Sequence, residues 1–333
     1  MKEAIILLNM GGPNNLHEVE MFLKNMFNDP NILTMKNNLL RRFIGGTITL
    51  FRAEAAQEIY RELGGKSPIV GHTKNLVADT QNAFDKCFED NTFDNEVYID
   101  YAMRYTPPFA DEVIAKLKEK NIEKVYLLPL YPQYSTTTTK SSLEDFEEAL
   151  QNNKMDTLVV EIKHYFENEL YNRAIIERIK EKMQEQKEGE NSTLEYRDFD
   201  LIFSAHGLPQ KIVDAGDPYQ RHIERHVEIL KEMIKKENLG FFNIHLAYQS
   251  KVGPMAWLKP SLEEKLETVR NRGVIIYPIA FTIDNSETDF ELEVEYREVA
   301  EKFGFTEYKV AKCVNNHPLF IEALKEIYTK MKH

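Results

Sequence analysis

One histidine and a group of carboxylates are the residues of this chain whose types and spacing best suit chemistry. His206 ends the apolar run in LIFSAHGLP, residues 201–209, and turn-forming residues follow it at once. Ligands of α/β folds bind beyond the carboxyl ends of parallel strands, which makes His206 a candidate site residue. The alternative interpretation is a ring that a backbone carbonyl satisfies within a tight turn, and this segment alone favours that alternative.

The carboxylates lie in FTIDNSETDFELEVEY, residues 281–296, directly after another apolar run. Four of them follow one another at spacings of three and four: Asp284, Glu287, Glu291 and Glu295. On a helix this spacing places side chains on one face, where like charges repel unless a cation or protons relieve them. Hard oxygen ligands suit a divalent metal, and an added imidazole would suit iron or zinc in passing. For Glu295 a solvated acidic face is the better interpretation.

A loop that holds the only tryptophan of the chain could wall a flat aromatic ligand. It lies in AYQSKVGPMAWLKP, residues 247–260, and carries Gln249, Ser250, Lys251 and Trp257. A second polar stretch, STTTTKSS at 135–142, offers hydroxyl groups and a helix N-terminus to anionic groups, although helix capping without a ligand explains it better. The glycine-rich nucleotide-binding patterns do not occur at a strand end.

Residues 31–52 combine apolar and basic side chains with little acid. Such a composition suits a surface that meets an anionic apolar molecule or the membrane interface. An ordinary amphipathic helix with solvated arginines fits the composition equally well.

Length, charge and cysteine content narrow the class of protein. The chain has 333 residues, a hydrophobic content of 42% and a net charge of −12. Its length favours two domains, and its negative charge argues against nucleic acid as a partner. Cys87 and Cys313 lie far apart without CxxC spacing, which excludes a thiolate zinc site and gives no sign of a disulfide framework. The N-terminal apolar run is too short for a signal peptide and no run is long enough to span a bilayer, so we expect a cytoplasmic protein.

Apolar runs of strand length alternate with helix-length segments along the whole chain. The runs lie at 3–10, 96–103, 124–131, 156–163, 200–206, 242–250, 273–281 and 305–311. Near-continuous runs of β-branched and aromatic residues are typical of parallel strands that are buried on both faces. The alternation predicts an α/β fold.

The chain also resembles itself in three places that follow the same order. NMGGP (9–13) resembles AHGLP (205–209), AMRYTPP (102–108) resembles AYQSKVGP (247–254), and PLYPQYSTTTTKSSLEDF (129–146) resembles IYPIAFTIDNSETDFELE (276–293). In the third pair, Tyr131 is matched with Tyr277. Two duplicated halves with a boundary near 150–156 explain this order, whereas each similarity alone could arise from chance likeness of strand ends.

Taken together, these segments resemble the ferrochelatase family, whose members insert ferrous iron into a porphyrin in haem synthesis. The motifs are LLNMGGP, GGKSPI, LYPQYS, FSAHGLP followed by DAGDPY, AYQSKVGPMAWLKP and DNSETDFELEVEY, in the order of the family. The resemblance implies two similar Rossmann-like domains of the chelatase type, each a parallel sheet flanked by helices, with the active cleft between them. We expect these domains at 1–152, with a porphyrin-lip insertion at about 31–66, and at 153–315. A C-terminal helix at 316–333 is expected to pack back on the first domain.

Carried over by position, the resemblance implies catalytic roles for His206, Glu287 and Asp284, and metal contacts for His206, Glu287 and Glu291. The expected porphyrin contacts are Met10, Arg52, Ser67, Tyr134, Gln249, Ser250 and Trp257. Two departures stand out: only one arginine aligns where some members have a pair, and Asn285 and Ser286 replace a common His-Ile. The loss of a second imidazole leaves proton transfer more dependent on carboxylates. No iron–sulfur centre or other bound cofactor is expected, because the sequence ends at His333 without a terminal cysteine cluster.

The expected reaction is the insertion of Fe²⁺ into a porphyrin, with protoporphyrin IX as the first choice, and with loss of two pyrrole protons. A neutral imidazole is a suitable acceptor for such a proton near pH 7. The expected partners are the porphyrin and ferrous iron, and residues 31–52 become a lip that could also contact a membrane peripherally. Three alternatives stay open: a chelatase for coproporphyrin or sirohydrochlorin, a non-catalytic porphyrin or haem carrier, and a hydrolase that uses Ser204 with His206.

Overall fold

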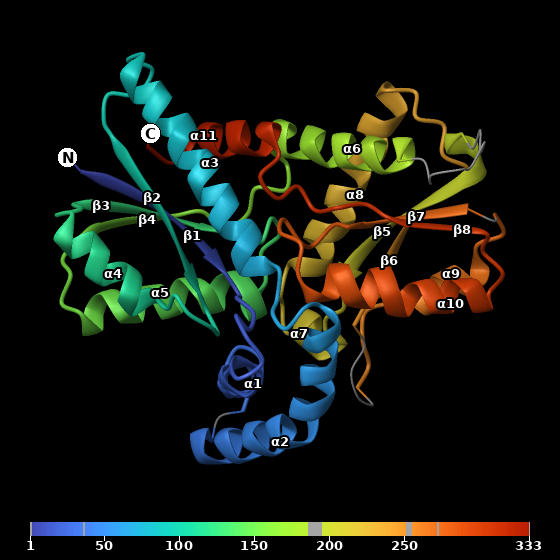
Figure 1. Cartoon of the computed structure of the whole chain (residues 1–333), viewed down its shortest axis with the longest axis horizontal. Coiled ribbons are helices and arrows are strands. Elements are labelled where there is room, and N and C mark those ends of the chain that lie inside the picture. The colour runs from blue at the N-terminus through green and yellow to red at the C-terminus, as the bar shows by residue number, and fades with distance from the viewer. Residues whose placement is uncertain (1, 36, 186–194, 251–254, 272, 333) are drawn as a thin grey trace. The chain divides into compact units, whose positions relative to one another are not determined.

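Two four-stranded parallel sheets form the framework of the chain, as Figure 1 shows for this computed structural model. The structure describes residues 2–35, 37–185, 195–250, 255–271 and 273–332. By its contacts the chain divides into a first unit, Met1–Tyr165 with Ile321–His333, and a second unit, Phe166–Phe320. The predicted α/β class with two similar parallel-sheet units is confirmed.

In the first unit, β1 (Glu3–Asn9) lies between β2 (Val97–Met103) and β3 (Lys124–Pro129), and β4 (Leu158–Glu161) pairs with the outer side of β3. All seven residues of β1 are buried, as the continuous apolar run predicts for a central strand that is covered on both faces. A π-helix, η1 (Thr136–Lys140), follows β3 and runs directly into α5 (Ser141–Asn152).

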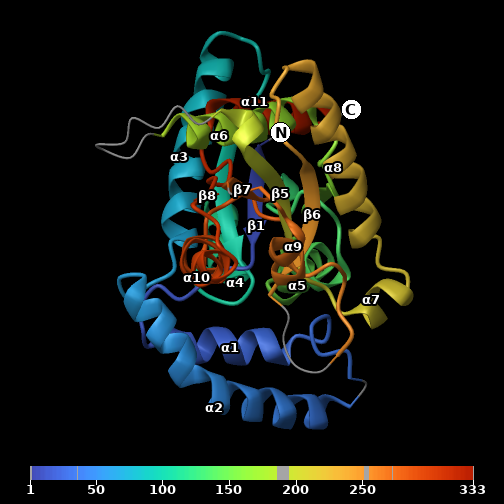
Figure 2. The ribbon, with the colours of Figure 1, turned by 90° about the vertical axis from the view of Figure 1, so that its right-hand side faces the viewer.

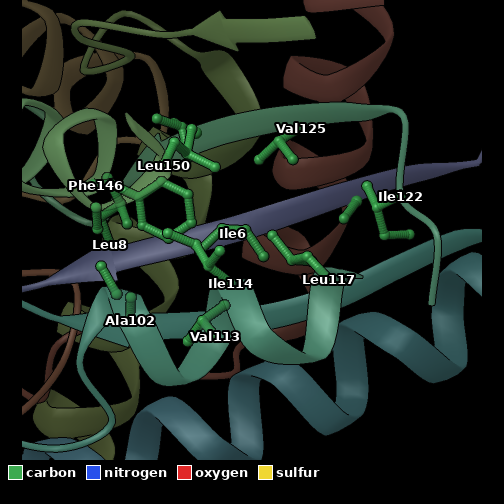
Figure 3. Close-up of a cluster of buried hydrophobic side chains, with 14 of the residues drawn as sticks. Ile6, Leu8, Ala102, Val113, Ile114, Leu117, Ile122, Val125, Phe146 and Leu150 are labelled. Carbon is green, nitrogen blue, oxygen red and sulfur yellow. The ribbon is translucent and has the colours of Figure 1, made fainter. Parts of the chain in front are cut away.

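A cluster of buried apolar side chains holds α4 (Ala110–Glu119) and α5 on one face of this sheet (Figure 3). It joins β1, β3, α4 and α5 through Ile6, Val125, Ile114, Leu117 and Phe146. Burial of each such side chain contributes about 1.5–3 kcal/mol, so the cluster is a main source of stability for this unit.

The end of the chain completes the first unit. In α11 (Pro318–Lys332), the ring of Tyr328 packs edge-on against Phe84 of α3 (Ile69–Glu89), with centroids 5.5 Å apart, and against Tyr126, with centroids 5.0 Å apart. The hydroxyl groups of Tyr328 and Tyr126 both donate to the buried carboxylate of Glu3 in β1. A buried carboxylate is costly unless it is hydrogen-bonded, so these bonds tie α11 to the first strand.

Two helices extend from the first unit after β1: α1 (Glu18–Asn28) and α2 (Asn38–Glu62), which Figure 2 shows side by side. Asn37 caps α2, because its side chain accepts hydrogen bonds from the backbone N–H groups of Leu39 and Leu40. The apolar face of α1 packs against α2 through a cluster that includes Phe22, Leu23 and Phe27. The opposite face of α2 leaves large apolar side chains exposed: Leu39, Leu40, Phe43, Leu50 and Phe51.

In the second unit, β5 (Phe199–His206) lies between β6 (Ile244–Gln249) and β7 (Gly273–Pro278), and β8 (Glu307–Val310) pairs with β7. Helices α6 (Glu169–Gln184) and α8 (Tyr219–Lys236) lie over one face, and α9 (Leu262–Thr268) and α10 (Tyr296–Lys302) over the other (Figure 1). The short helices η2 (Tyr196–Asp198) and α7 (Gln210–Asp214) precede and follow β5. A second π-helix, η3 (Glu287–Glu295), runs directly into α10.

The two sheets share one strand order, β2-β1-β3-β4 and β6-β5-β7-β8, which is the order expected from duplicated halves. Ala102 pairs with Leu8 of β1, and Ala247 pairs with Ser204 of β5. Since Leu8 and Ser204 directly precede NMGGP and AHGLP, AMRYTPP and AYQSKVGP occupy equivalent places, as their similarity predicts.

The third similarity is out of register. Leu8 pairs with Pro129 of β3, and Ser204 pairs with Pro278 of β7, so these two prolines are equivalent in the sheets. The predicted match of Tyr131 with Tyr277 is therefore wrong: Tyr277 lies inside β7, whereas Tyr131 follows the end of β3.

The division between the units falls later than the predicted boundary at 152/153. That boundary would assign β4 to the second unit, but β4 pairs in parallel with β3, with Val125 opposite Val159. The backbone groups of β4 thereby find their partners in the first sheet, and the division comes after Tyr165.

Candidate active site

His206 ends β5, its ring is partly exposed, and one hydrogen bond orients the ring while another holds its backbone carbonyl. Its Nδ1 lies 2.6 Å from the carbonyl oxygen of Gly207, and Tyr219 Oη donates to the His206 carbonyl at 2.9 Å. Because a carbonyl oxygen only accepts, the neutral ring carries its proton on Nδ1 and leaves Nε2 as an acceptor. Nε2 lies 3.5 Å from Glu287 Oε2. The two interpretations of His206 therefore both hold, since the ring is satisfied by a carbonyl on one side and faces a carboxylate on the other.

Glycine is required next to this histidine. A Cβ on Gly207 would come within 2.6 Å of the Gln249 carbonyl oxygen and 3.3 Å of Trp257 Cε3. The N–H of Gly207 donates to the same carbonyl at 2.8 Å, which joins the ends of β5 and β6. The indole of Trp257 thus packs close to Gly207, while Lys251 of the same loop is outside the described residues.

Glu287 and Glu291 come from η3, where the spacing of the carboxylates predicts an α-helix. The segment is instead a π-helix, whose hydrogen bonds span five residues and which occurs mostly at functional sites. Ser250 Oγ lies between the two carboxylates, 2.6 Å from Glu291 Oε2 and 3.3 Å from Glu287 Oε2. A hydroxyl donates one proton at a time, so the shorter bond is made to Glu291. Ser250 has a φ of 63°, a strained value for a residue other than glycine, of a kind that clusters at functional sites.

Gln249 continues this hydrogen-bonded chain into the core. Ser204 Oγ donates to Gln249 Oε1 at 2.7 Å, which leaves the amide N–H groups of Gln249 to face Glu291 Oε2 at 3.4 Å. Gln249 is only 1% exposed and faces Glu291, so its predicted role as a porphyrin contact has little support from its burial. Ser204 is fully buried and donates to Gln249, so the hydrolase interpretation, which needs an accessible nucleophile paired with His206, is wrong.

The pKa of Glu291 is raised to about 7, first by burial and then by the charge of Glu287. The hydrogen bond from Ser250 and the nearby His206 lower this pKa, but by less. Glu291 is therefore a carboxyl group that can gain or lose a proton near neutral pH. It is linked through Ser250 to Glu287, which itself faces His206.

Glu291→Gln is expected to stabilise the protein at about pH 8 and to leave its stability at about pH 5 nearly unchanged. A carboxyl group with a higher pKa in the folded state binds its proton preferentially there, so stability falls as the pH rises from the ordinary value of 4.5 through about 7. The glutamine amide does not ionise, so the free energy of unfolding of the variant should exceed that of the wild type by about 1–3 kcal/mol at the higher pH. Thermal melts at both pH values measure the gain, with the exposed Glu298→Gln of α10 as control. Equal melting temperatures of variant and wild type at the higher pH would contradict the raised pKa.

Asp284 lies in a different hydrogen-bonded cluster from His206 and Glu287. Its carboxylate accepts from the backbone N–H of Cys313 at 2.8 Å and from Asn315 Nδ2 at 2.7 Å, and its own N–H donates to Asn315 Oδ1 at 2.9 Å. The pKa of the Cys313 thiol is raised, first by burial and then by the charge of Asp284. Asp284 thus joins the chain before η3 to the chain after β8.

The predicted metal ligands do not form a ready-made metal centre. In the part of the chain that the structure describes, no three His, Cys, Asp or Glu side chains are grouped so that they could hold a metal ion. His206 and Glu287 are nevertheless accessible, with side chains 39% and 24% exposed. They can therefore reach a substrate or an ion that arrives from outside.

Four of the predicted porphyrin contacts lie in the first unit. Met10 is partly buried against the α1–α2 cluster, and Tyr134 is half-buried between β3 and η1. Arg52 of α2 is exposed, and its guanidinium lies over the ring of Phe27, 5.9 Å from the ring centroid. Ser67 is only 4% exposed, because it packs where a Cβ on Gly12 would approach it within 2.6 Å.

Two residues around His206 were not predicted to act on the site, Gly207 and Tyr219, and Ser204 was considered only as a hydrolase nucleophile. Tyr219 is the last residue of the DAGDPY motif, and Ser204 and Gly207 lie beside His206 in FSAHGLP, so each had a sequence signal. Their roles arise from contacts with other strands and helices, which no local pattern specifies.

Comparisons with known proteins agree on one family. The family model described as Ferrochelatase matches residues 2–332. A ferrochelatase from Sulfurimonas denitrificans is 60% identical over 99% of each chain, and one from a Nitratiruptor species is 48% identical over 99% of this chain and 100% of its own. Among solved structures, the sirohydrochlorin chelatase SirB from Bacillus subtilis subspecies spizizenii, in complex with cobalt, matches with a TM-score of 0.55 at 10% identity. It covers 99% of this chain and 95% of its own, and at that identity it indicates the fold alone.

Proposed function

Because this chain belongs to the ferrochelatase family, we propose that His206, Glu287 and Glu291 carry the proton and metal chemistry of its reaction. The reaction is the insertion of ferrous iron into a porphyrin in haem synthesis, and the chain is a metal chelatase of the lyase class. The observation that carries the residue assignment is the 3.5 Å separation of His206 Nε2 and Glu287 Oε2.

The first task of these residues is to remove protons from the porphyrin. Two pyrrole N–H protons must leave before a dication can sit among the four nitrogens. We assign the first proton to His206 Nε2, since Nδ1 already donates to Gly207. Two acceptors as close as Nε2 and the Glu287 carboxylate repel unless one holds a proton, so the negative charge of Glu287 stabilises the protonated ring.

Glu287 and Glu291 are proposed to receive the second proton and to guide the iron. Ser250 links their carboxylates, and Glu291 is buried deeply enough for its pKa to rise to about 7. Ferrous iron is a substrate here, and the porphyrin nitrogens replace its protein contacts as the product forms. No resident cofactor enters this proposal.

The porphyrin itself is proposed to contact Trp257 as a wall and to lie near Ser250 and the carboxylates that it links. Met10, Arg52, Ser67 and Tyr134 are the proposed contacts from the first unit. Arg52 has the best support, because an exposed guanidinium beside apolar side chains suits a propionate on an apolar ring. Ser67 has the least, because its side chain is almost fully covered.

A substrate comparison tests this proposal. Purified protein is mixed anaerobically with Fe²⁺ and with protoporphyrin IX, coproporphyrin or sirohydrochlorin, and metal insertion is followed by absorbance. We expect the highest kcat/KM with protoporphyrin IX, because the exposed face of α2 offers more apolar than basic groups. A higher kcat/KM with a more anionic tetrapyrrole would contradict the choice of substrate, and failure with all three would contradict the assigned chemistry.

We also propose that the exposed apolar face of α2 contacts membrane lipids peripherally. Its side chains Leu39, Phe43, Leu50 and Phe51 are each 73–80% exposed, and the exposed Arg42 on the same helix supplies positive charge for anionic lipids. Ile48 does not belong to this face, because it packs against the α1 cluster. Among the described residues, no helix is both long and apolar enough to span a bilayer.

The double variant Leu39→Glu, Phe43→Glu is expected to weaken binding to phosphatidylglycerol vesicles at least about tenfold, because it removes buried apolar area and adds charge at the lipid boundary. Co-sedimentation measures the bound fraction, and Phe242→Glu, at a side chain that is 61% exposed in the second unit, is the control. Equal sedimentation of the double variant and the wild type would contradict the contact.

A further inference from the structure

A glutamine in the second unit and an arginine in the first unit occupy equivalent positions. Arg104 comes two residues after Ala102, and Gln249 comes two residues after Ala247, the two alanines that the sheets place in equivalent register. Both side chains therefore start at the carboxyl end of the second strand of their unit, beside the helix that follows the third strand. The two units can be compared at this position without reference to how they are arranged.

In the first unit the arginine lies between two carboxylates and offsets part of their negative charge. Arg104 Nη1 lies 3.0 Å from Asp145 Oδ1, and its Nη2 lies 3.4 Å from Asp29 Oδ2. Its Nε donates to Ser141 Oγ at 3.0 Å, and Tyr105 Oη donates to Asp29 at 2.7 Å. The fully buried carboxylate of Asp29 and the carboxylate of Asp145 thus find their positive partner within the chain.

In the second unit the same position supplies no charge. Gln249 donates an amide N–H toward Glu291, which comes from the helix that follows β7, as Asp145 comes from the helix that follows β3. Within the described part of the chain, no lysine or arginine lies within ion-pair distance, 4.0 Å, of Glu287 or Glu291. Among the described residues, the ionisable partner of Glu287 is His206, which is positively charged only when it is protonated.

We propose that Gln249 determines how well the second unit accepts a metal cation, by keeping a neutral group where the first unit has a guanidinium. Gln249 is a positioning residue, because it acts through Glu291 and Ser204 holds its amide in the orientation that faces Glu291. The inference rests on the proposed roles of Glu287 and Glu291. In this way Glu291 lacks the guanidinium partner that Asp145 has in the first unit.

A charge series at position 249 tests this inference. Gln249→Lys, Gln249→Met and Gln249→Glu carry a positive, a neutral and a negative side chain, and cooperative thermal melts identify the folded variants. In anaerobic insertion assays we expect the KM for Fe²⁺ to rise at least about tenfold for Gln249→Lys, to stay within about twofold for Gln249→Met, and to fall for Gln249→Glu. The KM for the porphyrin should stay within about twofold throughout, which a general distortion of the site would not allow.

The order of the KM values decides the outcome. A folded lysine variant with the wild-type KM for iron, or an equal rise in the lysine and methionine variants, would overturn the inference. If Gln249→Lys does not fold, Gln249→Met and Gln249→Glu still test the inference. Equal KM values for iron in these two variants would overturn it. Glu291→Gln, assayed in parallel, separates the two levels. An unchanged KM for iron in Glu291→Gln contradicts the proposed role of Glu291. A raised KM for iron in Glu291→Gln, together with equal iron KM values for the three variants at position 249, contradicts only the role of Gln249.

Discussion

Replacing His206 with alanine is expected to lower kcat for iron insertion about 100- to 10,000-fold, the usual contribution of a positioned general base, while the KM for the porphyrin changes little. The ring offers Nε2 as an acceptor because Nδ1 donates to Gly207, and no other imidazole is described as facing Glu287. Alanine removes this acceptor and leaves the backbone of β5 and its bond from Tyr219 in place.

Added imidazole separates a chemical role of His206 from a structural one. The side chain is 39% exposed, so free imidazole can enter the space that the alanine variant leaves and restore part of the rate. A ring needed only for packing would not be replaced in this way. His17→Ala, at an exposed histidine of the first unit, is the control. Undiminished insertion by His206→Ala would refute the assignment.

Glu287→Gln is expected to lower kcat by about 100-fold or more and to raise the KM for iron, since the amide keeps the volume of the side chain and loses its charge. The wild-type carboxylate stabilises the protonated ring of His206 and attracts the dication. Anaerobic assays over a range of iron and porphyrin concentrations separate the two effects.

A matched control for this variant lies on the same helix. Glu293→Gln also removes a carboxylate from η3, but the side chain of Glu293 pairs with Arg297 away from His206. We expect Glu293→Gln to retain most of the activity. The double variant of His206 and Glu287 should lose little more than the worse single variant, because the two groups act as one unit. Additive losses would contradict that pairing.

Much of the fold could be predicted from the apolar runs, because strands that are buried on both faces leave a continuous signal in the sequence. The similarity of AMRYTPP to AYQSKVGP even predicted the register of β2 and β6 correctly. The match of Tyr131 with Tyr277 failed, because Tyr-Pro pairs occur both in a strand and in the loop beyond it. The hydrogen bonds of the sheet, rather than local likeness, set the register.

The site was predictable to the extent that strand ends determine it. His206 and Glu287 follow β5 and β7, and neighbouring parallel strands bring their carboxyl ends together. The placement of Asp284 was not predictable, because the helical spacing does not extend to residue 284 and because its partner Asn315 lies far along the chain. The role of Gln249 depends on the orientation of one amide, which only Ser204 of the neighbouring strand determines.

The bonds from Tyr328 to Glu3 have a consequence for the way the chain folds during synthesis. The second unit is one continuous stretch, Phe166–Phe320, and it can form as soon as that stretch has left the ribosome. The first unit is completed later, because Glu3 of its first strand is hydrogen-bonded by Tyr328, which lies 325 residues further along the chain. The half of the chain that is made first is therefore the half that is completed last.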